Sequence, residues 1–480
     1  MATPPDPSAP LMLSVSGARG LVGRSLTPGM VAEYAAAWGS IVAAGVAEGR
    51  GVVGGPPAVV LGRDSRPSGA MFAAAATAGL SGAGCAVVDL GVVATPTAGI
   101  MVGELKADAG MVITASHNPI EWNGIKCLDA RGVAPAPEQA ADLIDRFRTG
   151  RIDWAGPEDV PSATQNDTGH LVHVDRVLRL VDVDRIRAAG LRVVLDSVHG
   201  AGGPAGRMLL DALGCDIVHL YAEPTGRFPH VPEPTRENLT ELSARVPAEQ
   251  AVVGFAQDPD ADRLALVDEH GSYIGEEYTL VLAARRMLER FGADATPVMA
   301  ANLSTSRMID DLAARGGFPS VIRTAVGEAH VAGAMIAAEA AGAGTPLVGG
   351  EGNGGVIVPA VGWVRDSLSA MALVLDAVAG GMSVSEMVGD APAYAIEKDK
   401  LDLAAVGGRD AIPGILDGVR TLWSDGTVQD VDGVRVDRDG MWVHVRPSNT
   451  EPILRIIAEA PDVAGARDLI DTVRTLLPGN

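Results

Sequence analysis

The chain has 480 residues, 47% hydrophobic and 20% charged, which is the composition of a globular protein, and its length suggests three or four domains. Its net charge of −22 argues against a nucleic-acid partner, because nucleic-acid binding draws on a basic face. No uninterrupted apolar stretch approaches the roughly 20 residues of a membrane-spanning helix and the first ten residues lack a secretory signal, so we expect a cytoplasmic protein with no membrane partner.

One pattern recurs three times along the chain: an apolar strand, a turn of small and polar residues, a helix closed by glycine, and a second strand. The copies begin at Ala58, Arg192 and Pro297. Each copy predicts a βαβ unit, because parallel strands need a helical crossover. We therefore expect three similar α/β domains with mixed sheets, at residues 1–163, 164–272 and 273–388.

The last part of the sequence has a different pattern. Residues 434–460 alternate like antiparallel strands around a turn, and an amphipathic helix follows at 462–477. This order of elements predicts a smaller C-terminal α+β domain at 389–480. The three cysteines, Cys85, Cys127 and Cys215, have the spacing of neither a zinc site nor a disulfide framework, so we expect small buried hydrophobes.

The segment "MVITASHNPIEWNGIK", from Met111 to Lys126, begins as a buried strand and continues into small and polar residues. Apolar and β-branched residues explain the strand as far as Ile113. They do not explain Ser116, which follows the strand together with a histidine, an asparagine and a proline.

A second loop, in "VVGFAQDPDADRLALVDEHG", places Asp258, Asp260 and Asp262 at alternate positions between two apolar stretches. Three converging carboxylates repel one another unless a hard cation lies between them, and oxygen ligands suit Mg²⁺. Solvated acids in a surface turn are the plainer alternative.

Two other acidic motifs compete with this interpretation. A calcium-binding EF-hand would place its bidentate acid at Glu269, but its sixth position, where glycine is needed, holds Arg263, and the flanking residues predict strands. Phosphatases with an Asp-x-Asp nucleophile normally have Thr or Val where this chain has Asp262. A metal-binding loop accounts better for the pattern.

Two further loops carry polar groups suited to a sugar phosphate. "LVGGEGNGGVIVP" presents Glu351 and Asn353 among glycines, which allow the backbone to approach a ligand. "VRPSNTEPILR" groups an arginine with hydroxyl and amide side chains, the donors that a phosphate requires, although an ordinary turn would explain all but the arginine. Its residues are Arg446, Ser448, Asn449 and Thr450.

The four loops together resemble the α-D-phosphohexomutases, a family that includes phosphoglucomutase, phosphomannomutase and phosphoglucosamine mutase. "TASHNP" with "NGIK", "DPDADR", "GGEGNGG" and "RPSNTEP" occur in the order of that family, one in each domain. The resemblance covers essentially the whole chain. It implies four domains around a central cleft, with the serine after the strand carrying a phosphoryl group in that cleft.

The resemblance also implies roles for the residues of the first two loops. Ser116 would be the phosphoserine, and its phosphate would join Asp258, Asp260 and Asp262 around one Mg²⁺ per chain. The metal and Arg263 would spread the charge of the transferring phosphoryl group.

Further roles are implied around this centre. Arg19 matches an arginine of the first-domain loop, and Lys126 matches a lysine that transfers a proton to or from the sugar hydroxyl. His117 would either contact the phosphoserine or brace its loop. The residues implied to hold the sugar hydroxyls and the phosphate that is not transferred are Glu351, Asn353, Arg446, Ser448, Asn449 and Thr450.

Two positions depart from the pattern of several bacterial members. Those members have a serine and a histidine where this chain has Asn353 and Gly355. A histidine acid or base is therefore absent at that position, which gives more weight to Lys126.

The resemblance implies an intramolecular phosphotransferase that interconverts hexose 1-phosphates and 6-phosphates through a bisphosphate, with hexose 1,6-bisphosphate as activator. The "GEGNGG" loop together with "RPSNTEP" is similar to members called phosphoglucosamine mutase, and glucose or mannose phosphates are the alternative substrates. A metal-dependent sugar-phosphate phosphatase remains an alternative, as does a serine hydrolase, although the chain has no G-x-S-x-G elbow.

Overall fold

The computed structural model describes residues 11–15, 17–50, 55–292, 295–404, 406–448 and 453–477. The chain forms two compact units. Unit 1 comprises residues 1–290 and 354–388, and unit 2 comprises residues 291–353 and 389–480. The expected segment 273–388 thus contributes residues to both units.

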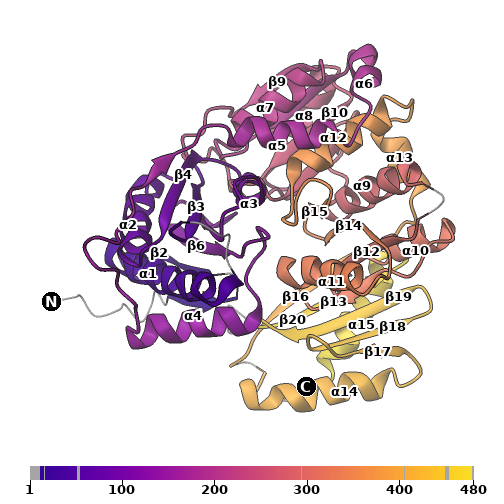
Figure 1. The fold of residues 1–480 in the computed structure, drawn as a ribbon. Helices are drawn as coiled ribbons and strands as arrows, with labels where there is room; N and C mark the ends of the chain where they lie inside the picture. Colours follow the sequence, from indigo (N-terminus) through magenta and orange to yellow (C-terminus); the bar gives the residue numbers. More distant parts are fainter. Residues whose placement is uncertain are drawn as a thin grey trace. The chain divides into compact units, whose positions relative to one another are not determined.

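Unit 1 begins with a mixed seven-stranded sheet in the order β1-β2-β6-β5-β3-β4-β7 (Figure 1). Strand β3 runs parallel to β4 and β5, whereas β6 is antiparallel to β5 and β2. Helices α1, α2 and α4 share a hydrophobic core with one face of this sheet, and α3 packs on the other. The bounds are β1 Met12–Ser14, β2 Gly17–Leu21, α1 Pro28–Gly45, the π-helix η1 Val46–Arg50, β3 Ala58–Arg63, α2 Gly69–Gly82, β4 Ala86–Val92, α3 Thr95–Glu104, β5 Ala109–Ile113, β6 Trp122–Leu128, α4 Pro137–Thr149 and β7 Thr164–Gln165.

A second sheet of unit 1 has the order β11-β10-β8-β9. Strand β8 runs parallel to β9 and β10, and β10 and β11 form an antiparallel pair around the acidic loop. The remaining elements of unit 1, not all of them in this sheet, are α5 Gly169–Leu178, α6 Val183–Ala189, β8 Arg192–Asp196, α7 Gly203–Ala212, β9 Asp216–Leu220, α8 Thr240–Ala248, β10 Val253–Gln257, β11 Leu264–Asp268, α9 Glu276–Arg290, β15 Gly355–Ile357, α12 Ser367–Val378 and α13 Val384–Asp390, whose last residues belong to unit 2.

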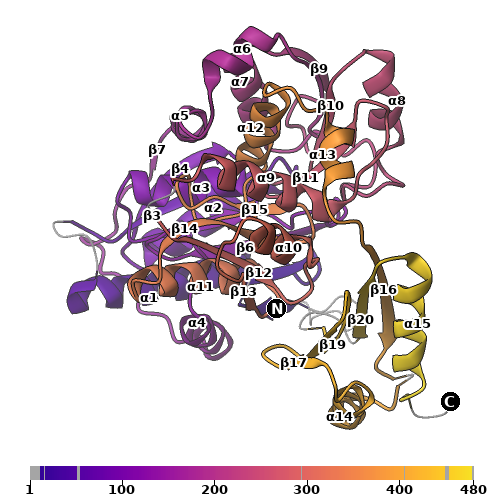
Figure 2. The same ribbon diagram turned by 90° about the vertical axis from the view of Figure 1, so that its right-hand side faces the viewer.

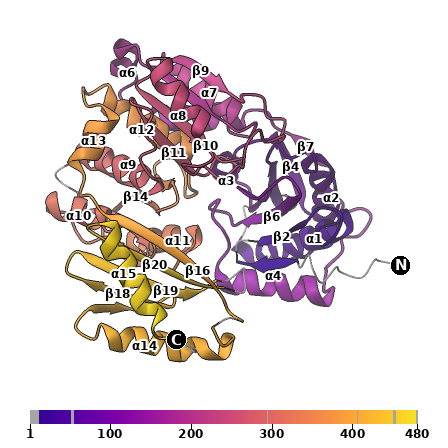
Figure 3. The ribbon, with the colours of Figure 1, turned by 180° about the vertical axis from the view of Figure 1, so that it is seen from behind.

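Unit 2 contains three parallel strands and, separately, an antiparallel sheet. Strand β12 lies between β13 and β14, parallel to both. The C-terminal sheet has the order β16-β20-β19-β18-β17 with every pair antiparallel, and α14 and α15 share its hydrophobic core (Figure 3). The bounds are β12 Pro297–Asn302, α10 Met308–Arg315, β13 Ile322–Thr324, α11 Glu328–Ala340, β14 Thr345–Glu351, β16 Ala395–Asp402, the 3₁₀ helix η2 Arg409–Ala411, α14 Ile412–Leu422, β17 Thr427–Gln429, β18 Val434–Arg438, β19 Met441–Pro447, β20 Ile453–Ala460 and α15 Val463–Arg474.

These elements confirm the fold expected from the sequence. The three repeated patterns are the units β3-α2-β4, β8-α7-β9 and β12-α10-β13, each with parallel strands. The C-terminal segment is an antiparallel sheet followed by a helix, as its alternation predicts. Of the three cysteines, which all lie in the described part of the chain and are unpaired, Cys85 and Cys127 are buried and Cys215 is partly exposed.

Helix α1 explains the most apolar stretch of the sequence. Pro28–Glu48 is the one helix in the described residues that is long and apolar enough to cross a membrane, and 56% of its apolar window is buried in the structure. A glycine of α2 allows the two helices to approach closely: a Cβ on Gly79 would lie 2.1 Å from the Ala32 carbonyl oxygen of α1. Helix packing thus accounts for the composition of α1.

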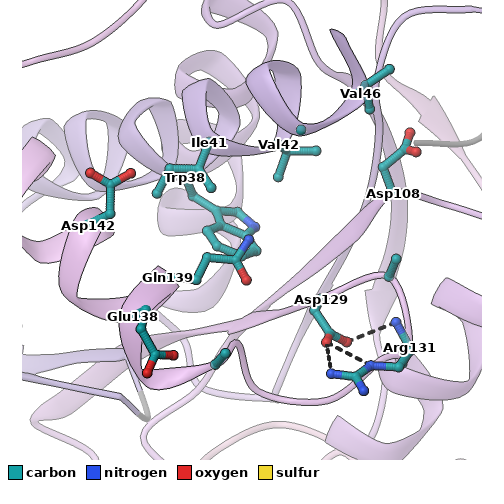
Figure 4. A pocket seen from close by; sticks show the side chains of 13 residues that line it. Trp38, Ile41, Val42, Val46, Asp108, Asp129, Arg131, Glu138, Gln139 and Asp142 are labelled. Atoms are coloured by element: carbon teal, nitrogen blue, oxygen red, sulfur yellow. Dashed lines mark hydrogen bonds and ion pairs between the residues drawn. The ribbon is translucent and has the colours of Figure 1, made fainter. Parts of the chain in front are cut away.

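A cavity of about 550 Å³ lies in unit 1 beside α1 and α4 (Figure 4). Trp38, Ile41 and Val42 of α1 form its apolar wall. Across the cavity, Arg131 donates from its backbone and its guanidinium to the carboxylate of Asp129. The thirteen residues that line it differ from the site residues expected from the sequence.

Candidate active site

Ser116 lies in the loop between β5 and β6 and has a φ of +50°, a left-handed conformation that is uncommon for residues other than glycine. The residue is 1% exposed. The strained turn directs the hydroxyl inward, and Ser116 Oγ donates to Asp258 Oδ2 at 2.9 Å. Local backbone conformation therefore places the serine against the acidic loop.

Arg66 binds the backbone of this loop. It is fully buried, and its guanidinium donates to the carbonyl oxygens of Ser116 and Asn118 at 2.6 Å each, of Pro119 at 2.7 Å, and of Trp122. Its Nε donates to Asp64 Oδ2 at 3.0 Å. Loops normally satisfy such carbonyls with water, so a single buried guanidinium makes this backbone unusually rigid.

Arg66→Met should lower the free energy of unfolding by about 3 to 5 kcal/mol, because it leaves Asp64 as an uncompensated buried charge and the loop carbonyls without donors. Chemical denaturation followed by fluorescence measures the change. Arg131→Met is the control and should change stability far less, since the Arg131 side chain is 53% exposed and its charge is solvated. Equal stability of the two variants would contradict the role assigned to Arg66.

Asp258, Asp260 and Asp262 form one cluster between β10 and β11. All three side chains are fully buried, and one carboxylate oxygen from each lies within 4.8 Å of the others. Asp260 Oδ1 and Asp262 Oδ1 have no hydrogen-bond partner although both are buried. Buried carboxylate oxygens without donors are costly, and a hard cation with oxygen ligands would satisfy them. The residues present therefore fit a Mg²⁺ ion.

Three cations partly balance this negative charge. Lys126 Nζ lies 2.8 Å from Asp260 and 3.2 Å from Asp262, and Arg365 Nη2 donates to Asp262 Oδ2 at 2.6 Å. Burial alone raises the pKa of Asp262, but Arg365, Lys126 and Arg263 together lower it below its ordinary value. Burial and the two neighbouring carboxylates raise the pKa of Asp258. The cluster thus holds unequal carboxylates, and the one that accepts from Ser116 is the weakest acid.

The other two residues expected near Ser116 lie close to it. Arg19 Nη1 donates to Asn118 Oδ1 at 3.2 Å in the same loop. His117 Nδ1 lies 3.4 Å from Ser116 Oγ. Burial, together with Arg263 and Arg19, places the pKa of His117 well below its ordinary value, so this imidazole is neutral at physiological pH.

In unit 2, the expected sugar-binding loop follows β14. Glu351 is 4% exposed, and its Oε1 accepts from Asn302 Nδ2 at 2.7 Å and from the Gly327 backbone at 3.0 Å. Asn353 Nδ2 donates to Glu351 Oε2 at 3.5 Å. The carboxylate is therefore fixed by donors on its Oε1 side.

The expected phosphate-binding loop follows β19 in the same unit. Arg446 is 6% exposed and its Nε lies 2.9 Å from Asp432 Oδ2, which also accepts from the Val326 backbone. Ser448 is buried at the start of the loop. Asn449 and Thr450 lie outside the described residues.

Three residues at the first unit's site were not identified from the sequence: Arg66, Arg365 and Thr95. Thr95 Oγ1 donates to Asp260 Oδ2 at 2.7 Å. Arg66 follows Asp64 by two residues in "GRDSRP", and Arg365 directly precedes Asp366 in "VRDSLS". An arginine in a polar turn at the end of an apolar run is the sequence signal for such a residue, and it carries more information in a chain with a large negative charge.

Comparison with known proteins identifies the family. The four domain models of phosphoglucomutase/phosphomannomutase match in order: α/β/α domain I over residues 12–152, domain II over 172–271, domain III over 275–394, and the C-terminal domain over 399–476. The chain belongs to the phosphoglucomutase/phosphomannomutase family, and it is a phosphohexomutase, an isomerase-type phosphotransferase.

Individual relatives agree with this family over nearly their whole length. A probable phosphoglucosamine mutase of Methanopyrus kandleri is 38% identical over 95% of each chain. A phosphoglucomutase/phosphomannomutase of Thermococcus kodakarensis is 35% identical over 95% of this chain and 96% of its own. The crystal structure of a phosphoglucomutase/phosphomannomutase family protein from Burkholderia thailandensis is similar with a TM-score of 0.82 at 28% identity, over 98% of this chain and 99% of the other.

Proposed function

We propose that this phosphohexomutase interconverts glucosamine 1-phosphate and 6-phosphate through a phosphorylated Ser116 and a bisphosphate intermediate, with hexose 1,6-bisphosphate as activator. The observation that carries the proposal is the contact of Ser116 Oγ with Asp258 Oδ2, at 2.9 Å, inside the cluster of three buried carboxylates. A hydroxyl held against a cation-binding cluster is where a phosphoryl group can be both attached and stabilised.

Phosphoryl transfer exchanges one P–O bond for another. The free hydroxyl of the hexose phosphate attacks the phosphorus on Ser116, and the bond from phosphorus to Oγ breaks. Lys126 takes the proton that the sugar hydroxyl loses, which requires its neutral amine form, with a metal ion in place of the lysine charge that pairs with Asp260 and Asp262 here. After the bisphosphate turns over, Ser116 Oγ attacks the other phosphate and Lys126 returns the proton to the released sugar oxygen. The enzyme ends as it began, and the sugar is isomerised.

The carboxylates of Asp258, Asp260 and Asp262 would hold the Mg²⁺, together with a phosphate oxygen on Ser116. Bound there, the ion would draw negative charge from the phosphoryl oxygens. Arg263 and Arg19 would orient the same oxygens, and His117, neutral at physiological pH, would brace the loop. Arg66 fixes the carbonyls behind Ser116, which keeps the attacking and leaving oxygen in one place.

The residues of unit 2 are proposed to bind the rest of the substrate. Glu351 Oε2 and Asn353 would accept and donate to the sugar hydroxyls or the amine, while Arg446, Ser448, Asn449 and Thr450 would hold the phosphate that is not transferred. We propose a cytoplasmic enzyme whose partners are small hexose phosphates.

The substrate is tested by incubating the purified enzyme with the 1-phosphates of glucosamine, glucose and mannose, with and without a bisphosphate primer. A mutase forms 6-phosphates and responds to the primer. Release of inorganic phosphate alone would favour the phosphatase alternative, and cleavage of an ester substrate without any metal would favour the serine hydrolase. Faster turnover of glucose or mannose phosphates than of glucosamine phosphate would overturn the proposed sugar preference.

Arg446→Ala should lower kcat/KM for every hexose phosphate by about 10-fold to 150-fold, because a charge-assisted contact to phosphate is worth roughly 1.5 to 3 kcal/mol. Released bisphosphate should accumulate in single turnovers of phosphorylated enzyme, because the variant binds the bisphosphate more weakly while this intermediate reorients.

The matched control is Arg438→Ala, an exposed arginine of the same sheet that pairs with Asp425. Its kinetics should equal those of the wild type. If Arg446→Ala left sugar-phosphate kinetics unchanged as well, this loop would not bind phosphate and the hydrolase alternative would gain support.

A further inference from the structure

Residues at the N-terminal ends of helices α3 and α12 contact the cluster of Asp258, Asp260 and Asp262 in unit 1. At the start of α3, the Thr95 backbone donates to the Asp260 carbonyl at 2.9 Å and the Thr95 hydroxyl to the Asp260 carboxylate. Just before α12, Arg365 donates to Asp262. Helix α5 lies beside both α3 and α12 (Figures 1 and 2). Two of the three carboxylates are thus fixed by residues from separate parts of the chain.

A single histidine of α5 joins these two helix ends. His173 is 0% exposed, with Nδ1 2.8 Å from Thr97 Oγ1 and Nε2 3.1 Å from Asp366 Oδ2. Thr97 is in the same helical turn as Thr95, and Asp366 is the neighbour of Arg365. The Thr97 hydroxyl and Nδ1 form a hydrogen bond, whereas Nε2 faces Asp366 Oδ2 as an ion-pair contact that does not have hydrogen-bond geometry.

Asp366 in turn determines the direction of the chain at Arg365. It caps α12 by accepting from the backbones of Leu368 and Ser369 at 2.9 and 3.1 Å, and it also accepts from the Ser369 hydroxyl. Burial alone raises the pKa of Asp366, but His173 and Ser369 lower it below its ordinary value, so the carboxylate is charged. Capping orients this carboxylate, with Oδ2 facing His173 Nε2 at 3.1 Å.

Packing alone does not account for this arrangement. Burying an imidazole against a carboxylate costs desolvation that apolar side chains of similar size would avoid. This buried pair lies next to Thr95 and Arg365, the two residues that contact Asp260 and Asp262. Partners of metal-binding carboxylates set the orientation of those ligands, and their loss commonly weakens metal binding or activity by about 10-fold to 100-fold.

We propose that His173 is a positioning residue for the metal-binding cluster: through Asp366 it holds Arg365 against Asp262, and through Thr97 it holds the turn of α3 that carries Thr95 against Asp260. His173 contacts neither substrate nor metal. The inference rests on the proposed function in that the cluster it supports is the proposed Mg²⁺ site of the mutase.

Mg²⁺ binding to the purified protein, measured by calorimetry without any substrate, is the primary test. His173→Ala should weaken Mg²⁺ binding by about 10-fold to 100-fold and lower kcat by a similar factor, with KM for the hexose phosphate little changed. His173→Gln, whose amide can replace Nε2–H toward Asp366, should recover much of both. Asp366→Asn keeps a good helix cap but removes the charge, and it should resemble His173→Ala.

Val177→Ala is the matched control for packing. Val177 is buried one turn further along α5, on the same face as His173, and has no polar link to Asp366. The variant should lower the melting temperature while leaving Mg²⁺ affinity unchanged. Loss of Mg²⁺ affinity in Val177→Ala equal to that in His173→Ala would overturn the proposal, because general loosening of α5 would then explain both.

A double-mutant cycle tests the route through Arg365. If His173 acts through this arginine, His173→Ala combined with Arg365→Met should weaken Mg²⁺ binding little more than Arg365→Met alone. Fully additive losses would overturn the route. Should His173→Ala fail to fold, the same cycle is carried out with Asp366→Asn.

The proposed function fails separately from this inference. Wild-type protein that binds Mg²⁺ but does not turn over hexose phosphates would overturn the mutase substrate, and weaker Mg²⁺ binding by His173→Ala would still support the positioning role. A mutase whose His173→Ala variant binds Mg²⁺ as the wild type does would overturn the positioning role alone.

Discussion

Ser116→Ala should reduce mutase turnover by on the order of 10³-fold or more, because the variant has no oxygen to carry the transferring phosphoryl group. Alanine tolerates the φ of +50° about as well as serine does, so the fold should survive and the melting temperature should change little. The variant loses one hydrogen bond, from Ser116 Oγ to Asp258 Oδ2. A coupled assay of 6-phosphate formation measures the loss.

Intact-mass measurement makes this result specific. The wild type should carry one phosphate in part of the molecules, about 80 Da, and Ser116→Ala should carry none. Ser320→Ala, which removes an exposed hydroxyl, is the control and should keep both the phosphate and the activity. Undiminished turnover in Ser116→Ala would remove the phosphoserine from the mechanism.

The second large effect concerns the metal. Excess chelator should abolish turnover and added Mg²⁺ should restore it, and Asp260→Asn should weaken Mg²⁺ binding strongly because one hard anionic ligand becomes a neutral amide. Calorimetric titration with Mg²⁺ separates loss of binding from loss of chemistry. The buried pair of Asp260 with Lys126 is also broken, so the melting temperature of the variant must be measured in parallel.

Asp439→Asn is the control for charge, because it removes an exposed carboxylate in the turn after β18. Its affinity for Mg²⁺ should equal that of the wild type. Full activity in excess chelator, or unchanged Mg²⁺ affinity in Asp260→Asn, would contradict a metal site at these aspartates.

The parts of this protein that could be predicted from sequence are those whose causes are local. The βαβ units were predictable because each strand, turn and helix leaves its own periodicity and punctuation within about 30 residues. Asp258, Asp260 and Asp262 were predictable as one cluster because alternate positions of a short loop bring them together whatever else the fold does. The segment MVITASHNP shows both the end of a strand and the serine that follows it, because both lie within nine consecutive residues.

Residues that act across the fold left weaker signals. Arg66 lies some 50 residues from the loop whose carbonyls it binds, and Arg365 lies 103 residues from Asp262. No periodicity links such pairs, since only packing of separate strands and helices brings them together. His173 reads in sequence as an ordinary position of an amphipathic helix, and its partners Thr97 and Asp366 lie 76 residues before it and far after it.

By itself the sequence determined the fold class, the three repeated units, the antiparallel C-terminal sheet and the loops that carry the chemistry, because hydrophobic periodicity and turn residues act over short distances. Tertiary structure alone decided that Ser116 turns inward to Asp258, that Arg66 satisfies the carbonyls around it, and that Thr95 and Arg365 hold the acidic cluster. These contacts depend on burial, which removes water as an alternative partner and leaves each buried polar group to be satisfied by charges and donors from distant parts of the chain.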